Sequence, residues 1–206
     1  MDVCMEASNN ATVASVGDAP HDIERAAASL VLAFDTDPFM RWMYDGPDGY
    51  LRGSASLFRV LVADARGAGG ARTIAVDGRS AGTALWLPPG AEDDDAAIDD
   101  VVRQTVEAPL RKVLGELIGR VYETRPTGPH WYLSSIGIDP AFRDRGLGGR
   151  LLAEGLQACD AAHLPAWLWS SNPRNLDFYG RHGFEALATI RVGGAPPLFP
   201  MLRTAR

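Results

Sequence analysis

Cysteine is nearly absent from this sequence of 206 residues. Its two cysteines are Cys4, near the amino terminus, and Cys159, inside an expected helix. Two cysteines placed in this way supply neither a disulfide framework nor a group of metal ligands. We therefore expect no metal site and a reducing, cytoplasmic setting.

The chain also lacks an excess of positive charge. It has 20 Lys and Arg against 26 Asp and Glu, which gives a formal net charge of −6 at pH 7. A general nucleic-acid binder neutralises phosphates with an excess of Lys and Arg. The composition therefore argues against a nucleic-acid partner.

Long apolar runs are missing as well. A membrane-spanning helix needs roughly 20 consecutive apolar residues, and even "RAAASLVLAF", residues 25–34, is short and follows directly on charged residues. The amino terminus carries Asp2 and Glu6, where a signal peptide would be basic. We expect neither secretion nor a membrane partner.

A hydrophobic content of 46% is enough for one sizeable core. We predict a flexible terminus over residues 1–10 and a single domain over 11–206. The spacing of apolar residues predicts helices over 21–34, with Asp18 as a possible N-cap, and over about 50–65. An Asp-Gly pair at 77–78 between two alternating segments predicts a hairpin over 71–88.

The second half alternates strands and helices. The acidic segment 90–102 leads into a helical pattern that continues to about Glu123. Strands are predicted over about 130–138, 166–171 and 184–192, with helices over 147–162 and 175–182. A strand, helix, strand unit gives a parallel pair with a right-handed crossover. Joined to the hairpin, it predicts a mixed sheet in an α/β (α+β) fold with helices on both faces.

The stretch "IDPAFRDRGLGGRLLAEGL", residues 138–156, places a glycine-rich loop before a helix. It carries three glycines and three arginines: Gly146, Gly148, Gly149, Arg143, Arg145 and Arg150. The first N–H groups of a helix have no internal partner, and the helix dipole favours an anion there. Glycines allow a large anion to approach, and arginines pair well with phosphate. The loop therefore predicts a pyrophosphate site.

Two alternatives compete with this interpretation. In the first, the glycines serve only a tight turn and close helix packing, and the arginines are solvated. A dinucleotide-binding fingerprint requires G-x-G-x-x-G, but Leu151 stands where the third glycine belongs. The dinucleotide interpretation is therefore disfavoured.

Two segments resemble the GNAT superfamily of N-acetyltransferases. Arg143-x-x-Gly146-x-Gly148 after a strand resembles the acetyl-CoA loop of that family. The segment "SSNPRNLDFYGRHGFEAL", residues 170–187, resembles its closing motif, carried here by Asn172, Asn175, Tyr179, Gly183 and Phe184. The pattern is most similar to the puromycin N-acetyltransferase-like branch, and the resemblance extends over about residues 73–192.

The resemblance implies a GNAT fold, with a mixed sheet of about six to seven strands that splays where acetyl-CoA lies. The pantetheine arm would pair with the backbone of Ile136 and Ile138, and the N–H groups of residues 145–150 would hold the pyrophosphate. Gly137 would present no obstructing side chain. The implied cofactor-binding residues are Ile136, Gly137, Ile138, Arg143, Asp144, Arg145, Gly146, Leu147, Gly148, Gly149, Arg150, Asn172 and Asn175.

The implied chemistry is direct attack of a neutral amine on the thioester in a ternary complex. The leaving thiolate needs a proton, and a tyrosine with a pKa of about 10 still carries its proton at pH 7. We predict Tyr179 as this acid, against the alternative of a core aromatic. Phe178 is predicted to be core, and helix capping is an equal alternative for Asn172 and Asn175.

The base that deprotonates the acceptor is not evident. The strand "HWYLSSIGI", residues 130–138, has no carboxylate, and Trp169 stands where the puromycin branch has a glutamate. We expect a water chain past Ser134 or Ser170, with His130 or His182 as the alternative. The acidic run 92–95 is read as a solvated helix start, or as an attractant for cationic amines.

These features predict an acetyltransferase that moves acetyl from acetyl-CoA to a primary amine, of a small molecule in the first instance. Two alternatives remain: a non-catalytic module that binds acetyl-CoA, and an enzyme that acetylates a protein amine. The protein is expected to be a monomer or a homodimer and to use no metal.

Overall fold

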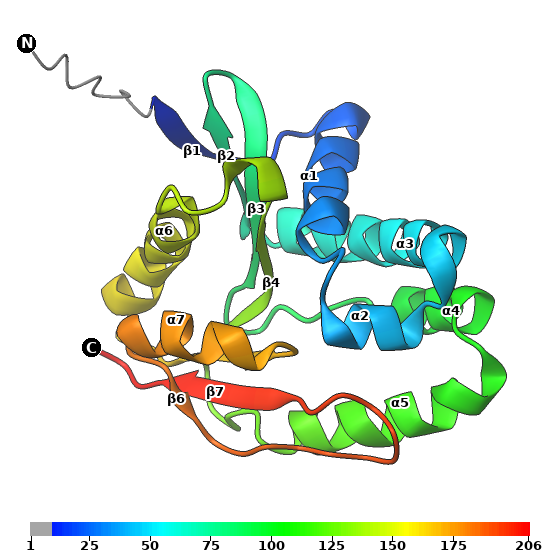
Figure 1. The fold of residues 1–206 in the computed structure, drawn as a ribbon. Helices are drawn as coiled ribbons and strands as arrows, with labels where there is room; N and C mark the ends of the chain where they lie inside the picture. Colours follow the sequence, from blue (N-terminus) through cyan, green and yellow to red (C-terminus); the bar gives the residue numbers. More distant parts are fainter. Residues whose placement is uncertain (1–9) are drawn as a thin grey trace, which may run out of the picture.

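The computed structural model describes residues 10–206, so the expected flexible terminus lies outside the described residues except for its last residue, and Cys4 lies outside them too. A seven-stranded mixed sheet has the order β1-β2-β3-β4-β5-β7-β6 (Figure 1). Among the strands of residues 10–206, β4 and β5 form the only parallel pair. The strands are β1 Ala11–Ser15, β2 Ala71–Val76, β3 Arg79–Leu87, β4 Trp131–Ile138, β5 Ala166–Ser170, β6 Glu185–Ala186 and β7 Phe199–Arg203. The predicted mixed α/β architecture is confirmed.

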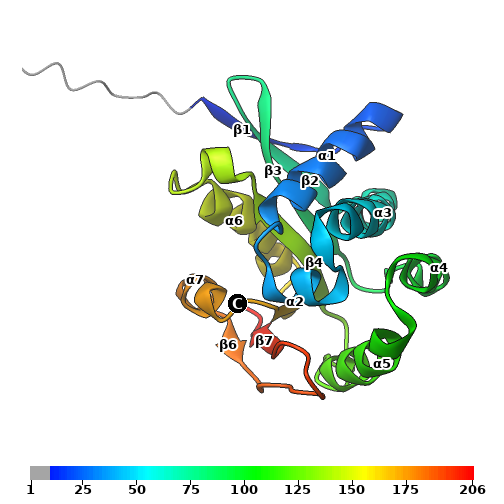
Figure 2. The same ribbon diagram turned by 45° about the vertical axis from the view of Figure 1, so that its right-hand side comes forward.

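Helices cover both faces of this sheet. They are α1 Pro20–Ala33, α2 Pro38–Met43, α3 Gly46–Gly67, α4 Asp95–Thr105, α5 Ala108–Tyr122, α6 Leu147–Ala161 and α7 Leu176–Arg181. Figure 2 shows α2, α3, α4 and α5 on one side of β4 and α6 on the other. Two apolar layers result, one between the sheet and α1 to α5, the other between the sheet and α6 with α7.

The local sequence explains the central elements. β3 is buried from Ala81 to Leu87, which accounts for its mostly apolar sequence; its one polar residue there, Thr83, shares a hydrogen bond of 2.8 Å with the Ser29 hydroxyl of α1. In α6 the buried residues Leu151, Leu152 and Leu156 recur at helical spacing and face the sheet. Between β2 and β3, Asp77 and Gly78 both have positive φ, at 49° and 75°. This is the geometry of a two-residue hairpin turn, as predicted.

The structure differs from the prediction at the first helix. α1 begins at Pro20 with Ala19 as its N-cap, and no side chain caps it. Asp18 instead forms an ion pair with Arg66 of α3. Pro20 explains the difference, because a proline is pre-organised for the first helical position and sets the start of the helix there.

The predicted strand over 184–192 is mostly wrong. Only Glu185–Ala186 pairs with β7, and Ile190 forms an isolated bridge with Leu198. The chain then returns as β7, which lies between β5 and β6. β7 escaped prediction because its sequence, FPMLR, shows no clean alternation and includes a proline.

β4 and β5 separate after two residue pairs. The pairs are Trp131 with Ala166 and Tyr132 with Trp167. β5 keeps its pairing with β7, and β4 keeps its pairing with β3 up to Ile138. Beyond Tyr132 the edge of β4 that faces β5 is therefore unpaired, and a wedge opens inside the sheet, as the GNAT resemblance implies.

A β-bulge lies at the start of this wedge. The register passes from Trp86↔Leu133 to Leu85↔Ser135, so Ser134 is an extra residue in β4. In a regular strand neighbouring side chains point to opposite faces, whereas a bulge interrupts this alternation. Ser134 and Ser135 accordingly line the same cavity.

Candidate active site

A groove of about 550 Å³ lies in the wedge. Most of the predicted cofactor-binding residues line it: Ile136, Gly137, Ile138, Arg143, Asp144, Gly146, Leu147, Gly148, Asn172 and Asn175. Tyr179 lines it too, whereas Arg145, Gly149 and Arg150 do not. The glycine loop and the closing motif, which are separate in the sequence, thus form opposite walls of one groove.

The glycine loop opens α6 with bare backbone. Gly146 is the N-cap, with a left-handed φ of 71°, and a Cβ built on it would meet nothing within 4 Å. The Arg150 N–H already donates to the Gly146 carbonyl at 3.1 Å. The N–H groups that the helix geometry leaves free are therefore those of Leu147, Gly148 and Gly149. The resemblance implied a wider set, the N–H groups of residues 145–150.

The arginines of the loop have different surroundings. Arg143 lines the groove and donates to the Ala33 carbonyl at 2.8 Å, which connects the loop to the end of α1. Arg145 donates to the Ala141 carbonyl at 3.3 Å and does not line the groove. Arg174, which the sequence analysis did not single out, is an exposed cation on the opposite wall.

The closing motif combines capping with lining. The Asn172 side chain accepts a hydrogen bond from the Arg174 N–H at 3.1 Å, so the capping alternative is confirmed for Asn172. Asn175 caps nothing with its side chain. Phe178 was predicted to be core, but it is only partly buried and lines the groove. Phe178 lies beside the glycine loop, since a Cβ on Gly148 would lie 3.7 Å from the Phe178 ring.

Gly137 is required for a different reason than the sequence suggested. A Cβ on Gly137 would lie 2.5 Å from Ala33 Cβ and 3.3 Å from Leu30. The missing side chain therefore makes room for α1 to pack on β4. Gly137 still lines the groove with its backbone.

Tyr179 is 7% exposed and lines the groove from α7. Burial, and then the negative charge of Asp37, raise the pKa of its hydroxyl well above the usual value. The phenol therefore keeps its proton throughout the physiological range, as a proton donor must. The role of Tyr179 as the acid stays a prediction.

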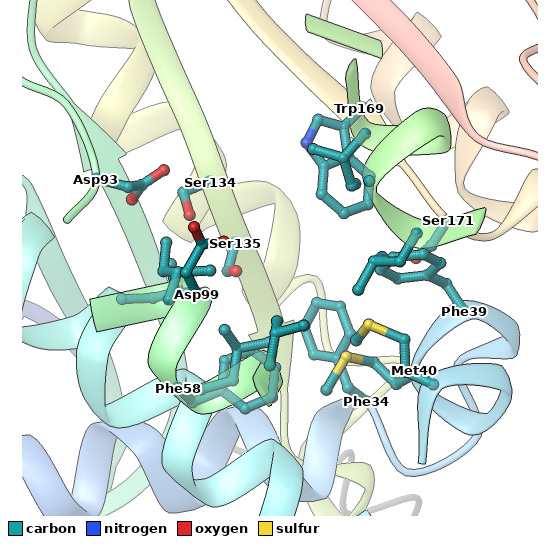
Figure 3. A pocket seen from close by; sticks show the side chains of 18 of the residues that line it. Phe34, Phe39, Met40, Phe58, Asp93, Asp99, Ser134, Ser135, Trp169 and Ser171 are labelled. Carbon is teal, nitrogen blue, oxygen red and sulfur yellow. The ribbon is translucent and has the colours of Figure 1, made fainter. Parts of the chain in front are cut away.

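A second cavity, of about 440 Å³, adjoins the groove. Apolar side chains from α2 to α5 and from β5 line most of it, among them Phe39, Met40, Phe58 and Trp169. Figure 3 shows Asp93, Asp99, Ser134 and Ser135 together at one side, with the aromatic and methionine side chains around the rest. Such a cavity suits an apolar body that carries one polar end.

The two cavities share Phe34 and Asp37. Asp37 Oδ1 accepts hydrogen bonds from the Phe39 and Met40 N–H groups at 3.0 and 3.1 Å, and so caps α2. Burial raises the pKa of Asp37, and these hydrogen bonds, with one from Ser171, oppose the rise. α2 was not predicted, although Asp37-Pro38 carries the signal of an N-cap followed by proline.

The acidic run 92–95 was expected to be a solvated helix start or an attractant for cationic amines, and the first expectation does not hold for Asp93. Asp94 does begin a helix, because its side chain accepts from the Ala97 N–H at 3.0 Å. Asp93, however, lines the second cavity, and its Oδ1 is shielded from solvent with no hydrogen-bond partner in the part of the chain described. Burial, and next the charge of Asp64, raise the pKa of Asp93 to about 7.

The base candidates named from the sequence lie in different places. Ser134 lines the second cavity, but the Ser170 hydroxyl bonds to the Asn172 carbonyl at 3.0 Å. His130 accepts from Arg125 at 2.8 Å, and His182 bonds through Nδ1 to the Phe178 carbonyl at 2.8 Å. Neither histidine lines either cavity.

Trp169 closes the second cavity from β5. Its Nε1 donates to the Tyr132 hydroxyl at 3.1 Å, and its ring meets Phe39 edge-on at 5.6 Å between centroids. Its apolar face is therefore fixed toward the cavity, which is the position that the sequence analysis expected for an acceptor contact.

A splayed mixed sheet, with a glycine loop opening a helix beside the splay, is typical of the GNAT fold. Residues 79–184 match the acetyltransferase (GNAT) family. The chain belongs to this family and is an acetyltransferase, and the family uses acetyl-CoA.

Solved structures share the fold. A structure described as histone acetyltransferase HPA2 and related acetyltransferase from Corynebacterium glutamicum has a TM-score of 0.72 and 23% identity, covering 95% of this chain and 97% of that one. The polyamine N-acetyltransferase of Drosophila melanogaster has a TM-score of 0.69 and 16% identity, covering 95% and 100%. Arylalkylamine N-acetyltransferase 2 of Aedes aegypti has a TM-score of 0.63 and 13% identity, covering 96% and 100%.

Two further properties concern residues 10–206. None of the helices there is long and apolar enough to cross a bilayer. In the same range, no three or more His, Cys, Asp or Glu side chains gather as ligands for a metal ion.

Proposed function

We propose that this enzyme transfers the acetyl group of acetyl-CoA to the primary amine of a small molecule, by direct attack in a ternary complex. The observation that carries the proposal is the contact between the two cavities at Phe34 and Asp37. One cavity has the features of a phosphate-bearing ligand site, and the other suits an apolar acceptor. Both substrates are then bound at once, and no acetylated enzyme is needed.

The groove supports binding of the donor through the backbone. The N–H groups of Leu147, Gly148 and Gly149 would hold the pyrophosphate, with Arg143 and Arg174 adding positive charge from both walls. The unpaired edge of β4 would hold the pantetheine arm as an added half-strand. Of the predicted contact residues that do not line the groove, Gly149 takes part in this proposal through its N–H group, and Arg145 and Arg150 take part through the loop that they shape.

The chemistry forms a C–N bond and breaks a C–S bond. A backbone N–H of β4 near Ile136 would stabilise the oxyanion, and one such donor contributes roughly 3 kcal/mol. Tyr179 would donate its proton to the leaving sulfur, which converts the thiolate into a thiol. A proton released from nitrogen then restores the phenol.

The second cavity favours a small acceptor over a protein. Its walls come from four helices and two strands, and they are mostly apolar. A primary amine with an alkyl or aromatic body fits this lining. We retain two further proposals from the sequence: a place in the puromycin N-acetyltransferase-like branch, with Trp169 where that branch has glutamate, and a cytoplasmic setting.

The test is an amine panel with acetyl-CoA, read as release of free thiol. Small primary amines with apolar bodies should give turnover, and polyamines and peptide amino termini should give less. Turnover only with peptides would favour a protein acetyltransferase. Tight acetyl-CoA binding without turnover on any amine would favour the non-catalytic module.

A further inference from the structure

Three carboxylates line the second cavity, and they differ in what their oxygens already do. Asp37 accepts two backbone hydrogen bonds on Oδ1 and one from Ser171 on Oδ2. Asp99 is exposed to solvent. Asp93 has a shielded Oδ1 with no partner among residues 10–206. Only Asp93 combines a position in the cavity wall with an unmet capacity to accept a proton or a hydrogen bond.

We propose that Asp93 is the catalytic base: its carboxylate binds the ammonium of an apolar amine in the second cavity and removes one proton from it. This inference rests on the proposed function. It replaces the water chain that the sequence analysis expected, and it uses a residue outside the strand in which a carboxylate was sought.

The lining of the cavity supports an ammonium end at this side. Figure 3 shows Asp93 at the same side as Ser134 and Ser135, away from Trp169 and Met40. An amine whose nitrogen meets Asp93 would have hydroxyl groups beside it and mostly apolar walls around its body. Two cations also line the cavity, and both have partners: Arg103 of α4 pairs with Asp100, and Arg111 of α5 donates to the Val106 carbonyl at 2.8 Å. Burying an ammonium is costly unless it is paired, and Asp93 supplies the pairing charge.

The groups around Asp93 set its strength as a base. Asp64 of α3, Asp95 at the start of α4 and the adjacent Glu92 carry negative charges that raise its pKa. Arg125, just beyond α5, acts in the opposite sense.

Two phenols also face Asp93. They are Tyr122 of α5 and Tyr132 of β4, whose own pKa values are raised by burial and further by the charge of Asp93. Both phenols therefore stay neutral near pH 7. The charged groups that act on the pKa of Asp93 are then the neighbouring carboxylates and Arg125.

The resulting pKa suits the proton transfer. An ordinary aspartate, with a pKa of 3.8, is about 6.6 units below an alkylammonium of about 10.4. A pKa of about 7 narrows the difference to about 3.4 units while leaving a large ionised fraction at neutral pH. The step converts R–NH₃⁺ and the carboxylate into R–NH₂ and the carboxylic acid, which then releases its proton to solvent.

The kinetic test compares the pH dependence of kcat/KM for hexylamine and for a fluorinated hexylamine whose pKa is about two units lower. With Asp93 as the base, both amines show a break near pH 7, and the upper break follows the amine. Asp93→Asn removes the lower break and reduces kcat/KM by about 10²-fold or more. The control Asp48→Asn, an exposed carboxylate of α3, leaves both unchanged. A break that persists in Asp93→Asn overturns the inference.

A binding test keeps the inference separate from the proposed function. Calorimetry measures the binding of hexylamine and of hexanol with coenzyme A present. Asp93→Asn should weaken hexylamine binding at least tenfold relative to Asp48→Asn and leave hexanol binding unchanged. If Asp93→Asn weakens the binding of both ligands equally, Asp93→Glu is measured next. Recovery of hexylamine binding in Asp93→Glu supports the inference, and failure to recover it overturns the inference. If no amine is acetylated by the wild type, the proposed function fails, and the binding result still decides the role of Asp93.

Discussion

Ser171 donates a hydrogen bond of 2.5 Å to Asp37 Oδ2, which fastens the end of β5 to the start of α2. The two residues are 134 positions apart in the chain, and both line the second cavity. The other oxygen of Asp37 caps α2. A single buried carboxylate therefore connects two elements, β5 and α2, at the place where the two cavities adjoin.

Replacement of Ser171 by alanine should lower the free energy of unfolding by about 1–3 kcal/mol, because Asp37 Oδ2 loses its partner. The loss should be larger at pH 7 than at pH 4. Ser171 lowers the pKa of Asp37, so its removal raises that pKa further and disfavours the ionised form. Ser54→Ala is the matched control, since this buried hydroxyl donates only to the Tyr50 carbonyl of its own helix. Urea denaturation at both pH values measures the effect, and equal losses for the two variants would contradict it.

Asp93→Asn should stabilise the protein at pH 8 by about 1–3 kcal/mol and have little effect at pH 4. The pKa of Asp93 in the folded state, about 7, lies above its usual value of 3.8. At pH values between these two, the Asp93 carboxyl is protonated in the folded state and ionised in the unfolded chain. The free energy of unfolding therefore falls as the pH rises from about 4 to about 7. Asparagine does not ionise, so this pH-dependent loss should be absent in the variant. A destabilised variant at pH 8 would show that the Asp93 charge is favourable in the fold.

Asp64→Asn should shift the lower break in kcat/KM below pH 7 and preserve the maximal rate. Asp64 is the charged group that raises the pKa of Asp93 most. Asparagine keeps an oxygen that accepts the hydrogen bond from the Asp94 N–H, which is 2.9 Å long in the structure. The break is measured from about pH 5 to about pH 10, a range that brackets pH 7 and approaches the pKa of an alkylammonium. An unchanged break would mean that it does not belong to Asp93.

Tyr179→Phe should lower kcat by about 10²-fold with little change in acetyl-CoA affinity, as expected for loss of a proton donor. Tyr50→Phe offers a matched control. Tyr50 is also buried, but its hydroxyl donates to the Val31 carbonyl and it lines neither cavity. The control should affect stability and spare kcat. Near-wild-type turnover in Tyr179→Phe would make Tyr179 a packing residue.

Gly148→Glu should abolish acetyl-CoA binding and leave the fold intact. A Cβ at Gly148 would make only ordinary contacts, the nearest 3.6 Å from Ile138. The rest of the glutamate side chain brings bulk and negative charge to the groove. Gly119→Glu places the same side chain at an exposed helix position with open space around it. This control variant should bind acetyl-CoA normally. Calorimetry decides, and a folded Gly148→Glu with unchanged affinity would refute the loop assignment.

The fold was predictable where the signals are local. The Asp77-Gly78 turn, the leucine spacing of α6 and the glycine loop each follow from a few adjacent residues, and each was placed correctly. The second cavity was not predicted, because its lining depends on packing between segments that are distant in the sequence. Asp93 has the same sequence context as its neighbour Asp94, yet Asp93 alone of the two lies in the cavity wall, near Asp64 of α3, Tyr122 of α5 and Tyr132 of β4. Asp37 meets Ser171 only after β5 and α2 come together, which no spacing rule indicates.

The unpaired edge of β4 also bears on how this protein avoids association with other chains. Open strand edges at the margin of a sheet invite pairing with another protein. Here the open edge lies in the interior of the sheet, and β5, held on its far side by β7, stands across from it. A second protein would have to separate β5 from β4 to lie along that edge, whereas a slender ligand arm would not. The gap that exposes backbone groups for binding thus also restricts what can reach them.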